Sequence, residues 1–219
     1  MVPNNHPENQ TVYTRKSVVP GEKSYSDALI ENEKKENHDK NDNHNIKIFT
    51  DSIPKGIKVK ELNEQIHHGH ARVHSFPGAT SKQLLHYLDV NIEDSTDTVL
   101  IHIGVNDILQ SVSNMDRLLL NVREMVRKCR LFGVKNMFVS GLVYTRRIRV
   151  NILNDLQKKL VDICREMNVY YIDNTNIKGV SLFKDGLHLL DSDKKILAKN
   201  FVNSINNFLS VMHKPIYLT

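Results

Sequence analysis

Residues 98–104 read TVLIHIG, a near-continuous apolar run that ends in a glycine. A run of this kind, without alternating polar residues, is typical of a strand that is buried on both faces. Residues 136–142 (NMFVSGL) repeat the pattern. A helical periodicity over about 115–131 separates the two runs, and Gly133 breaks that helix. These three segments predict two buried strands that are joined by a helix.

The same alternation of strand and helix continues on both sides of this unit. Further strands are expected at 46–50 (IKIFT), 72–76 (RVHSF) and 169–174 (VYYIDN). Further helices are expected in the 57–67 region and at 81–89, 149–167 and 192–209, the last with Asp191 as its cap. Five strands separated by helices predict right-handed crossovers and a five-stranded parallel sheet. The predicted fold class is therefore α/β, a three-layer α/β/α domain of flavodoxin-like type.

The composition indicates one domain with a polar tail. Of 219 residues, 40% are hydrophobic and 25% are charged, which is ordinary for a globular chain. Residues 1–45 lack apolar periodicity and end in ENEKKENHDKNDNHN, so we predict a disordered tail there and a folded domain at 46–219. The formal net charge is +5, and the predicted domain holds 24 of the 30 Lys and Arg against 17 of the 25 Asp and Glu. A mildly basic domain is compatible with anionic ligands or with nucleic acid.

The sequence also bears on the compartment. The N-terminus (MVPNNHPENQ) is polar and lacks the apolar core of a signal peptide, and no apolar run approaches the length that spans a bilayer. Cys129 and Cys164 both fall inside amphipathic helical patterns, which favours reduced core thiols. We predict an intracellular, cytoplasmic protein without a transmembrane segment, with a nuclear location left open.

A serine follows the first predicted strand. The apolar run of residues 46–50 stops at Asp51 and Ser52, and Pro54 suits the first turn of a helix. The pattern predicts that Ser52 is presented to solvent at a strand-to-helix corner, beside helix-end amides. By itself, an Asp-Ser pair is more often a turn or a helix cap.

Other polar groups follow the remaining strands, at the edge of the sheet where ligands bind in this fold class. Acyl transfer needs a nucleophile, a base, a group that orients the base, and donors for the oxyanion. Ser52 can be the nucleophile and His188 the base, with Asp185 orienting the imidazole. The oxyanion donors would be the backbone amides of Ser52 and Gly78 and the side-chain amide of Asn106. Each of these motifs alone is also a common turn.

These motifs occur in an informative order: Asp51-Ser52, then Gly78, then Gly104-x-Asn106-Asp107, then Asp185-x-x-His188. The order resembles the four blocks of the SGNH (GDSL-type) hydrolases, over about residues 46–210. The resemblance implies the same α/β/α fold, no cofactor, and the roles given above for the five residues. It also implies hydrolysis of small acyl esters, such as acetyl esters.

A narrower resemblance concerns three sequence segments, IFTDSIPKGI, HSFPGATSKQLLHYL and KDGLHLL. They are similar to the esterase-like domain of LINE-type retrotransposon products, which implies a role near nucleic acid or membrane. One position departs from the family, because Thr50 stands where a glycine usually precedes the Asp-Ser pair. Its branched Cβ suits the end of a strand but crowds a corner that glycine leaves open, so the fold is expected to be kept, and the departure motivates the second hypothesis below.

A second hypothesis is a catalytically impaired binding module. Tyr144, Arg146, Arg147 and Arg149 follow the fourth predicted strand. Tyr144, Arg146 and Arg147 are candidates for substrate binding, and the arginines are equally candidates for a basic face that makes a weak contact with nucleic acid or binds a partner protein. A solvated helix start is the simplest interpretation of the same residues. The oligomeric state stays open.

Four histidines lie close together in the sequence: His67, His68, His70 and His74. They straddle a loop at Gly69 and a predicted strand, and no cysteine or carboxylate accompanies them at ligand spacing. We therefore predict no metal site.

Overall fold

The computed structural model describes residues 43–178 and 182–212. Most of the predicted tail lies outside these residues. The strands are β1 (His44–Thr50), β2 (Gly69–Ser75), β3 (Thr98–His102), β4 (Asn136–Ser140) and β5 (Tyr170–Ile172). The helices are α2 (Val59–Asn63), α3 (Ser81–Asn91), α4 (Val105–Gln110), α5 (Met115–Leu131), α6 (Val150–Glu166) and α7 (Asp191–Met212), with a short 3₁₀ helix, η1 (Val112–Asn114).

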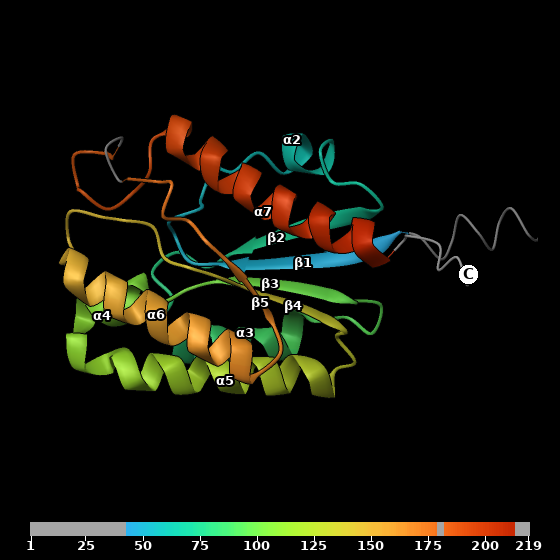
Figure 1. Ribbon diagram of the computed structural model, residues 1–219, viewed down its shortest axis with the longest axis horizontal. Coiled ribbons are helices and arrows are strands. Elements are labelled where there is room, and N and C mark those ends of the chain that lie inside the picture. Colours follow the sequence, from blue (N-terminus) through green and yellow to red (C-terminus); the bar gives the residue numbers. More distant parts are fainter. Residues whose placement is uncertain (1–42, 179–181, 213–219) are drawn as a thin grey trace, which may run out of the picture. The chain divides into compact units, whose positions relative to one another are not determined.

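All five strands are parallel, in the order β2-β1-β3-β4-β5. This is the strand order of flavodoxin-like folds, so the predicted fold class is confirmed. Strand β1 starts at His44, two residues before the expected domain boundary, and β2 starts at Gly69, three residues before the expected strand. In Figure 1 the carboxyl ends of the strands lie at the left, where the loop that enters α7 also lies.

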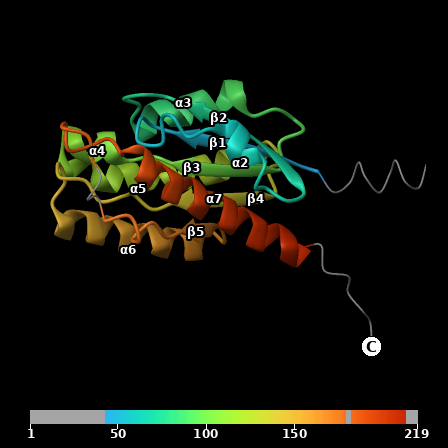
Figure 2. The same ribbon diagram turned by 90° about the horizontal axis from the view of Figure 1, so that it is seen from above.

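Helices cover both faces of the sheet. Figures 1 and 2 show α2 and α7 on one side and α3, α4, α5 and α6 on the other. Strand β3 serves both layers: Leu100 packs in one apolar cluster with Phe201 of α7, whereas Val99 and Ile101 pack in another with Leu84 of α3. The unbroken apolar run of β3 has this two-sided burial as its cause. Among the described residues, no helix is both long and apolar enough to cross a bilayer.

Two local predictions differ from the structure. No helix begins at Pro54, because Gly56 has a φ of 90°, which a right-handed helix cannot continue through. Instead the chain makes consecutive turns, in which the Lys55 amide donates to the Ser52 carbonyl at 3.1 Å and the Ile57 amide donates to the Pro54 carbonyl at 3.0 Å. In addition, α4 and η1 were not expected, because they are only 6 and 3 residues long.

Candidate active site

Ser52 lies two residues after the end of β1, the strand beside the central strand β3. Its exposed fraction is 8%, so the residue is more covered than the expected open corner. The Ser52 hydroxyl makes no hydrogen bond to His188 or to any other described residue. Hydrogen bonds between catalytic groups are often long when no substrate is bound, so the absence of a bond between Ser52 and His188 does not decide the role of Ser52.

Thr50 fits the strand without a special backbone conformation. Among the described residues other than glycine, only His68 and Asn168 have a positive φ, so Thr50 lies in the region where branched residues are at ease. The residue is fully buried between Ser75 of β2 and His102 of β3. Its hydroxyl donates to the Asp51 carbonyl at 3.2 Å. The structure therefore shows no need for glycine at this position.

Asp51 and Asp107 are buried carboxyl groups beside the candidate nucleophile. The Ile53 amide donates to Asp51 Oδ1 at 2.9 Å, whereas Oδ2 has no partner in the described part of the chain. Asp107 accepts from the Ser81 amide at 2.9 Å and from its hydroxyl at 2.6 Å, at the start of α3. Asp107 thus fixes α4 to α3, a role that the sequence motif alone did not reveal.

The predicted oxyanion donors lie in two connected segments. Asn106, on the first turn of α4, donates from Nδ2 to the Ala79 carbonyl at 2.9 Å. Gly78, the residue before Ala79, is exposed and has a φ of 79°, and no atom lies within 4 Å of the place that a Cβ would take. The space beside Gly78 is therefore open, and the second N–H of the Asn106 amide is still available to an oxyanion.

Asp185 and His188 come together in one turn between β5 and α7. Asp185 Oδ2 lies 2.6 Å from His188 Nδ1, and Asp185 Oδ1 accepts from the amides of Leu187 at 2.9 Å and His188 at 3.1 Å. The bond to His188, together with the two amides, lowers the pKa of Asp185 to about 2. The carboxylate is thus ionised at neutral pH, and His188 Nε2 is left for a substrate or a nucleophile.

The loop after β4 supports this turn through its backbone. The Arg146 amide donates to the Gly186 carbonyl at 2.9 Å. Gly186 has a φ of 68°, and a Cβ there would meet Arg146 Cβ at 3.2 Å. The tie was not predicted, since nothing in the sequence pairs these two residues.

The predicted substrate-binding side chains have different surroundings. Tyr144 is half-buried and donates from its hydroxyl to Asn154 Oδ1 at 2.8 Å, which holds the loop to α6. The side chains of Arg146, Arg147 and Arg149 are exposed. No described contact assigns a ligand to them, so their role stays a prediction.

The four clustered histidines are spread over the structure. His67 and His68 precede β2, and His70 and His74 lie within it. Phe49 stacks on the His74 ring, with 5.2 Å between ring centroids. In the ranges 43–178 and 182–212, no three His, Cys, Asp or Glu side chains are grouped as metal ligands.

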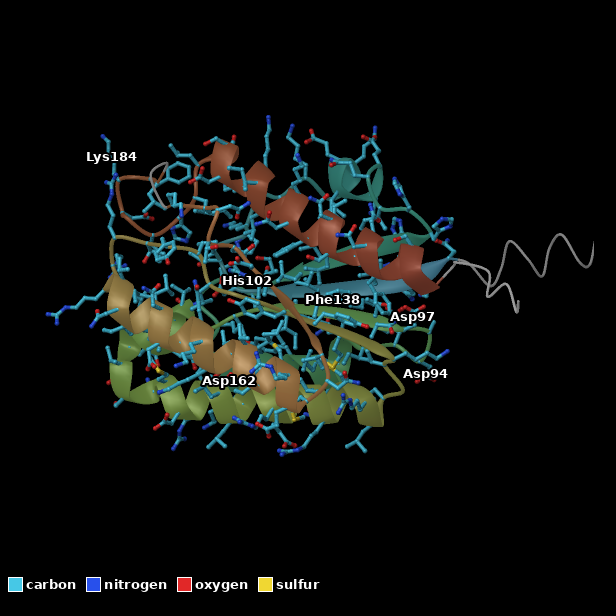
Figure 3. All side chains as sticks on the ribbon, in the orientation of Figure 1. Asp94, Asp97, His102, Phe138, Asp162 and Lys184 are labelled. Carbon is cyan, nitrogen blue, oxygen red and sulfur yellow. The ribbon has the colours of Figure 1, made fainter. Side chains whose placement is uncertain are left out.

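A buried polar network lies under α7 and was missed by the sequence analysis. His102 Nδ1 lies 2.9 Å from the Ser140 hydroxyl, to which Asn174 Nδ2 donates at 2.7 Å. Nε2 of His102 is buried without a partner among the described residues, and Phe201 of α7 lies beside the ring. Figure 3 shows His102 and Phe138 in the layer between the sheet and α7, whereas Lys184 extends from the outer edge of the loop.

Two buried groups give the stability of the fold opposite dependences on pH. Burial raises the pKa of Asp51 to about 7 from 3.8, so the folded chain keeps a proton that the unfolded chain releases. This stabilisation is present at low pH and is lost as the pH rises to about 7. Burial lowers the pKa of His102 to about 4 from 6.5, so the unfolded chain takes up a proton that the folded chain does not. This contribution is present above pH 6.5 and is lost as the pH falls toward 4.

We expect Asp51→Asn and His102→Asn to tilt the pH profile of stability in opposite directions. As the pH rises from about 4.5 to about 7.5, the unfolding free energy of Asp51→Asn relative to the wild type should rise by a few kcal/mol, and that of His102→Asn relative to the wild type should fall by a few kcal/mol. Urea unfolding at several pH values measures this. Two variant profiles parallel to the wild-type profile would contradict the burial argument.

For Asn106→Ala we expect a loss of roughly 10² to 10³ in kcat for a short-chain ester, as for the removal of one oxyanion donor. Asn114→Ala is the matched control, because Asn114 Nδ2 also donates to a backbone carbonyl, that of Asp107, at 3.2 Å. The control should keep kcat near that of the wild type. A fall of less than about twofold in Asn106→Ala, far below the range for such donors, would exclude the role.

Comparison with known families identifies the chain. A profile of the GDSL-like Lipase/Acylhydrolase family matches residues 57–193. The chain belongs to this family. The matched segment includes Gly78, Asn106, Asp185 and His188, but it starts after Ser52. No curated protein sequence matches the chain.

Several esterases of known structure have a fold similar to that of this GDSL-like chain. A psychrotrophic esterase from Pseudoalteromonas sp. aligns with a TM-score of 0.65 at 19% identity, over 76% of this chain and 99% of that chain. A catalytic mutant of an acetylxylan esterase from Geobacillus stearothermophilus aligns with a TM-score of 0.61 at 16% identity, over 74% of this chain and 94% of that chain. A GDSL-like lipase from Bacteroides thetaiotaomicron aligns with a TM-score of 0.62 at 16% identity, over 83% of this chain and 98% of that chain. At these identities the likeness establishes the fold.

Proposed function

We propose that this GDSL-like protein is a serine esterase that hydrolyses small acyl esters. The observation that carries the proposal is the Asp185–His188 pair, whose oxygen and nitrogen lie 2.6 Å apart, on the same edge of the sheet as Ser52 and Asn106. Family membership supports ester hydrolysis in general terms. The acetylxylan esterase among the similar structures supports an acetyl group as the first acyl group to test.

In the proposed mechanism, His188 Nε2 takes the proton of the Ser52 hydroxyl as Oγ attacks the ester carbonyl. Asp185 holds Nδ1–H and so fixes the tautomer in which Nε2 is the acceptor. The amides of Ser52 and Gly78 and the free N–H of Asn106 would stabilise the oxyanion. His188 then returns the proton to the leaving alcohol, and water hydrolyses the acyl-serine by the same steps in reverse.

A fluorophosphonate probe tests this directly, because it forms a covalent bond to the oxygen of an activated serine. We expect one label per chain, located on Ser52 by peptide mapping, and no label in His188→Gln. Labelling of another serine, or equal labelling in both proteins, would contradict the proposed nucleophile. Hydrolysis of p-nitrophenyl acetate then establishes turnover.

The binding-module hypothesis has one structural argument, the exposure of Arg146, Arg147 and Arg149 after β4. Its test is a salt-dependent affinity for single-stranded nucleic acid that falls when the three arginines are replaced. The narrower resemblance to LINE-type retrotransposon products and the intracellular location stay predictions.

A further inference from the structure

A pocket of about 380 Å³ lies between α2 and the first turns of α7, and the proposed chemistry does not use it. One wall begins at Gly56, which follows Ser52 in the turns after β1, and the other begins at Asp191, at the start of α7. Figure 1 shows α2 and α7 on the same side of the sheet. The pocket is thus built from the two segments that continue from Ser52 and from His188.

The charged lining of this pocket is mainly basic. It contains four lysines, Lys58, Lys194, Lys195 and Lys199, against two carboxylates. Lys58 is paired with Glu61 at 2.7 Å and Lys194 with Asp191 at 3.2 Å. In the part of the chain that the structure describes, Lys195 and Lys199 have no acidic partner. Two positive charges on neighbouring turns of α7 are therefore left for an anion.

The floor of the pocket is apolar. Leu62 of α2 belongs to the apolar cluster under α7, the partly buried Ile57 packs against that cluster, and both residues line the pocket. Lys194, with a side-chain exposure of 15%, reaches the opposite wall of the pocket, because a Cβ on Gly56 would be 3.4 Å from its Nζ. An apolar floor below a basic rim matches a ligand with an apolar part and a negative head.

We propose that the α2–α7 pocket binds a small anion that carries a short apolar group, with the negative head between Lys195 and Lys199. Phosphate monoesters and carboxylates share this chemistry, and lysine ammonium groups bind both through charge-assisted hydrogen bonds. The apolar group lies on Leu62 and Ile57. The proposal does not depend on Ser52 as a nucleophile.

Isothermal titration calorimetry with butyl phosphate, butyrate and inorganic phosphate tests the pocket. We expect butyl phosphate to bind more tightly than inorganic phosphate, which lacks the apolar group. The comparison of butyl phosphate with butyrate shows which head group the pocket prefers. Inorganic phosphate that binds as tightly as butyl phosphate would overturn the role of the apolar floor.

Matched double variants locate the site. Lys195→Gln with Lys199→Gln should weaken butyl phosphate binding about tenfold or more, since hydrogen bonds to charged groups are lost. Lys135→Gln with Lys158→Gln removes the same charge from exposed lysines outside the pocket, and its affinity should stay within about twofold, because screened charges at a distance contribute little. Equal losses in both double variants, or no loss in either, would overturn the proposal.

Ser52→Ala separates this inference from the proposed esterase function. The variant should bind butyl phosphate with wild-type affinity, because Ser52 does not line the pocket. Binding that disappears in Ser52→Ala and survives in the lysine variant would place the anion at the candidate active site and overturn the pocket.

Discussion

Replacing Ser52 by alanine is expected to lower kcat for p-nitrophenyl acetate about 10⁴-fold or more, as the loss of a nucleophile does in serine hydrolases. Without Oγ, no acyl-serine forms, and the remaining rate is that of water and of surface imidazoles. The fold should be unaffected, because the Ser52 hydroxyl makes no hydrogen bond within the described residues. A thermal melt within a few degrees of the wild type would confirm that the loss is chemical.

Ser75→Ala is the matched control for this experiment. Ser75 ends β2 at the same edge of the sheet, and its hydroxyl donates to the Asp51 carbonyl at 3.0 Å. We expect this variant to keep its activity within a few-fold of the wild type. An unchanged rate in Ser52→Ala would mean that another group hydrolyses the ester.

Asp185→Asn is expected to lower kcat by roughly 10³ to 10⁴, with little change in KM. The asparagine oxygen can still accept from the Leu187 and His188 amides, so the turn should keep its shape. Its amide group, however, would donate to His188 Nδ1 and leave the proton on Nε2. This tautomer cannot accept the Ser52 proton.

The same substitution at Asp173 is a close control. Asp173 Oδ1 accepts from the amide two residues later, at Thr175, at 2.8 Å, as Asp185 Oδ1 does from Leu187. No histidine is bonded to Asp173 among the described residues, so Asp173→Asn should keep full activity. Steady-state kinetics and thermal melts of both variants make the comparison. If Asp185→Asn kept more than half of the activity, the orienting role would be wrong.

The alternation of strands and helices along the chain could be predicted because the decisive signals are local. The apolar run at 98–104 comes from residues that are close in the chain. The same holds for the helical periodicity that extends over the 17 residues of α5. The six residues of α4 are too few for such a periodicity. The turns after Ser52 could not be predicted, because a proline at position 54 also suits the first turn of a helix, and the positive φ of Gly56 that decides the local path is a property of the folded chain.

The candidate site was predicted from the order of its motifs, and its supporting contacts were not. The Asp185–His188 bond joins residues three positions apart, within reach of a sequence argument. The bonds from Asn106 to Ala79 and from His102 to Ser140 span 27 and 38 residues. The raised pKa of Asp51 likewise depends on burial, which only the folded chain creates.

The hydrogen bond from the Arg146 amide to the Gly186 carbonyl bears on protein engineering. Every amino acid except proline carries this donor, so the turn that presents His188 does not depend on the identity of residue 146. The exposed side chains at positions 146 and 147 can therefore be randomised in a library, with proline left out at position 146. Such a library would vary the exposed side chains after β4, which are the predicted substrate-binding positions, while the turn that holds His188 keeps its backbone hydrogen bond.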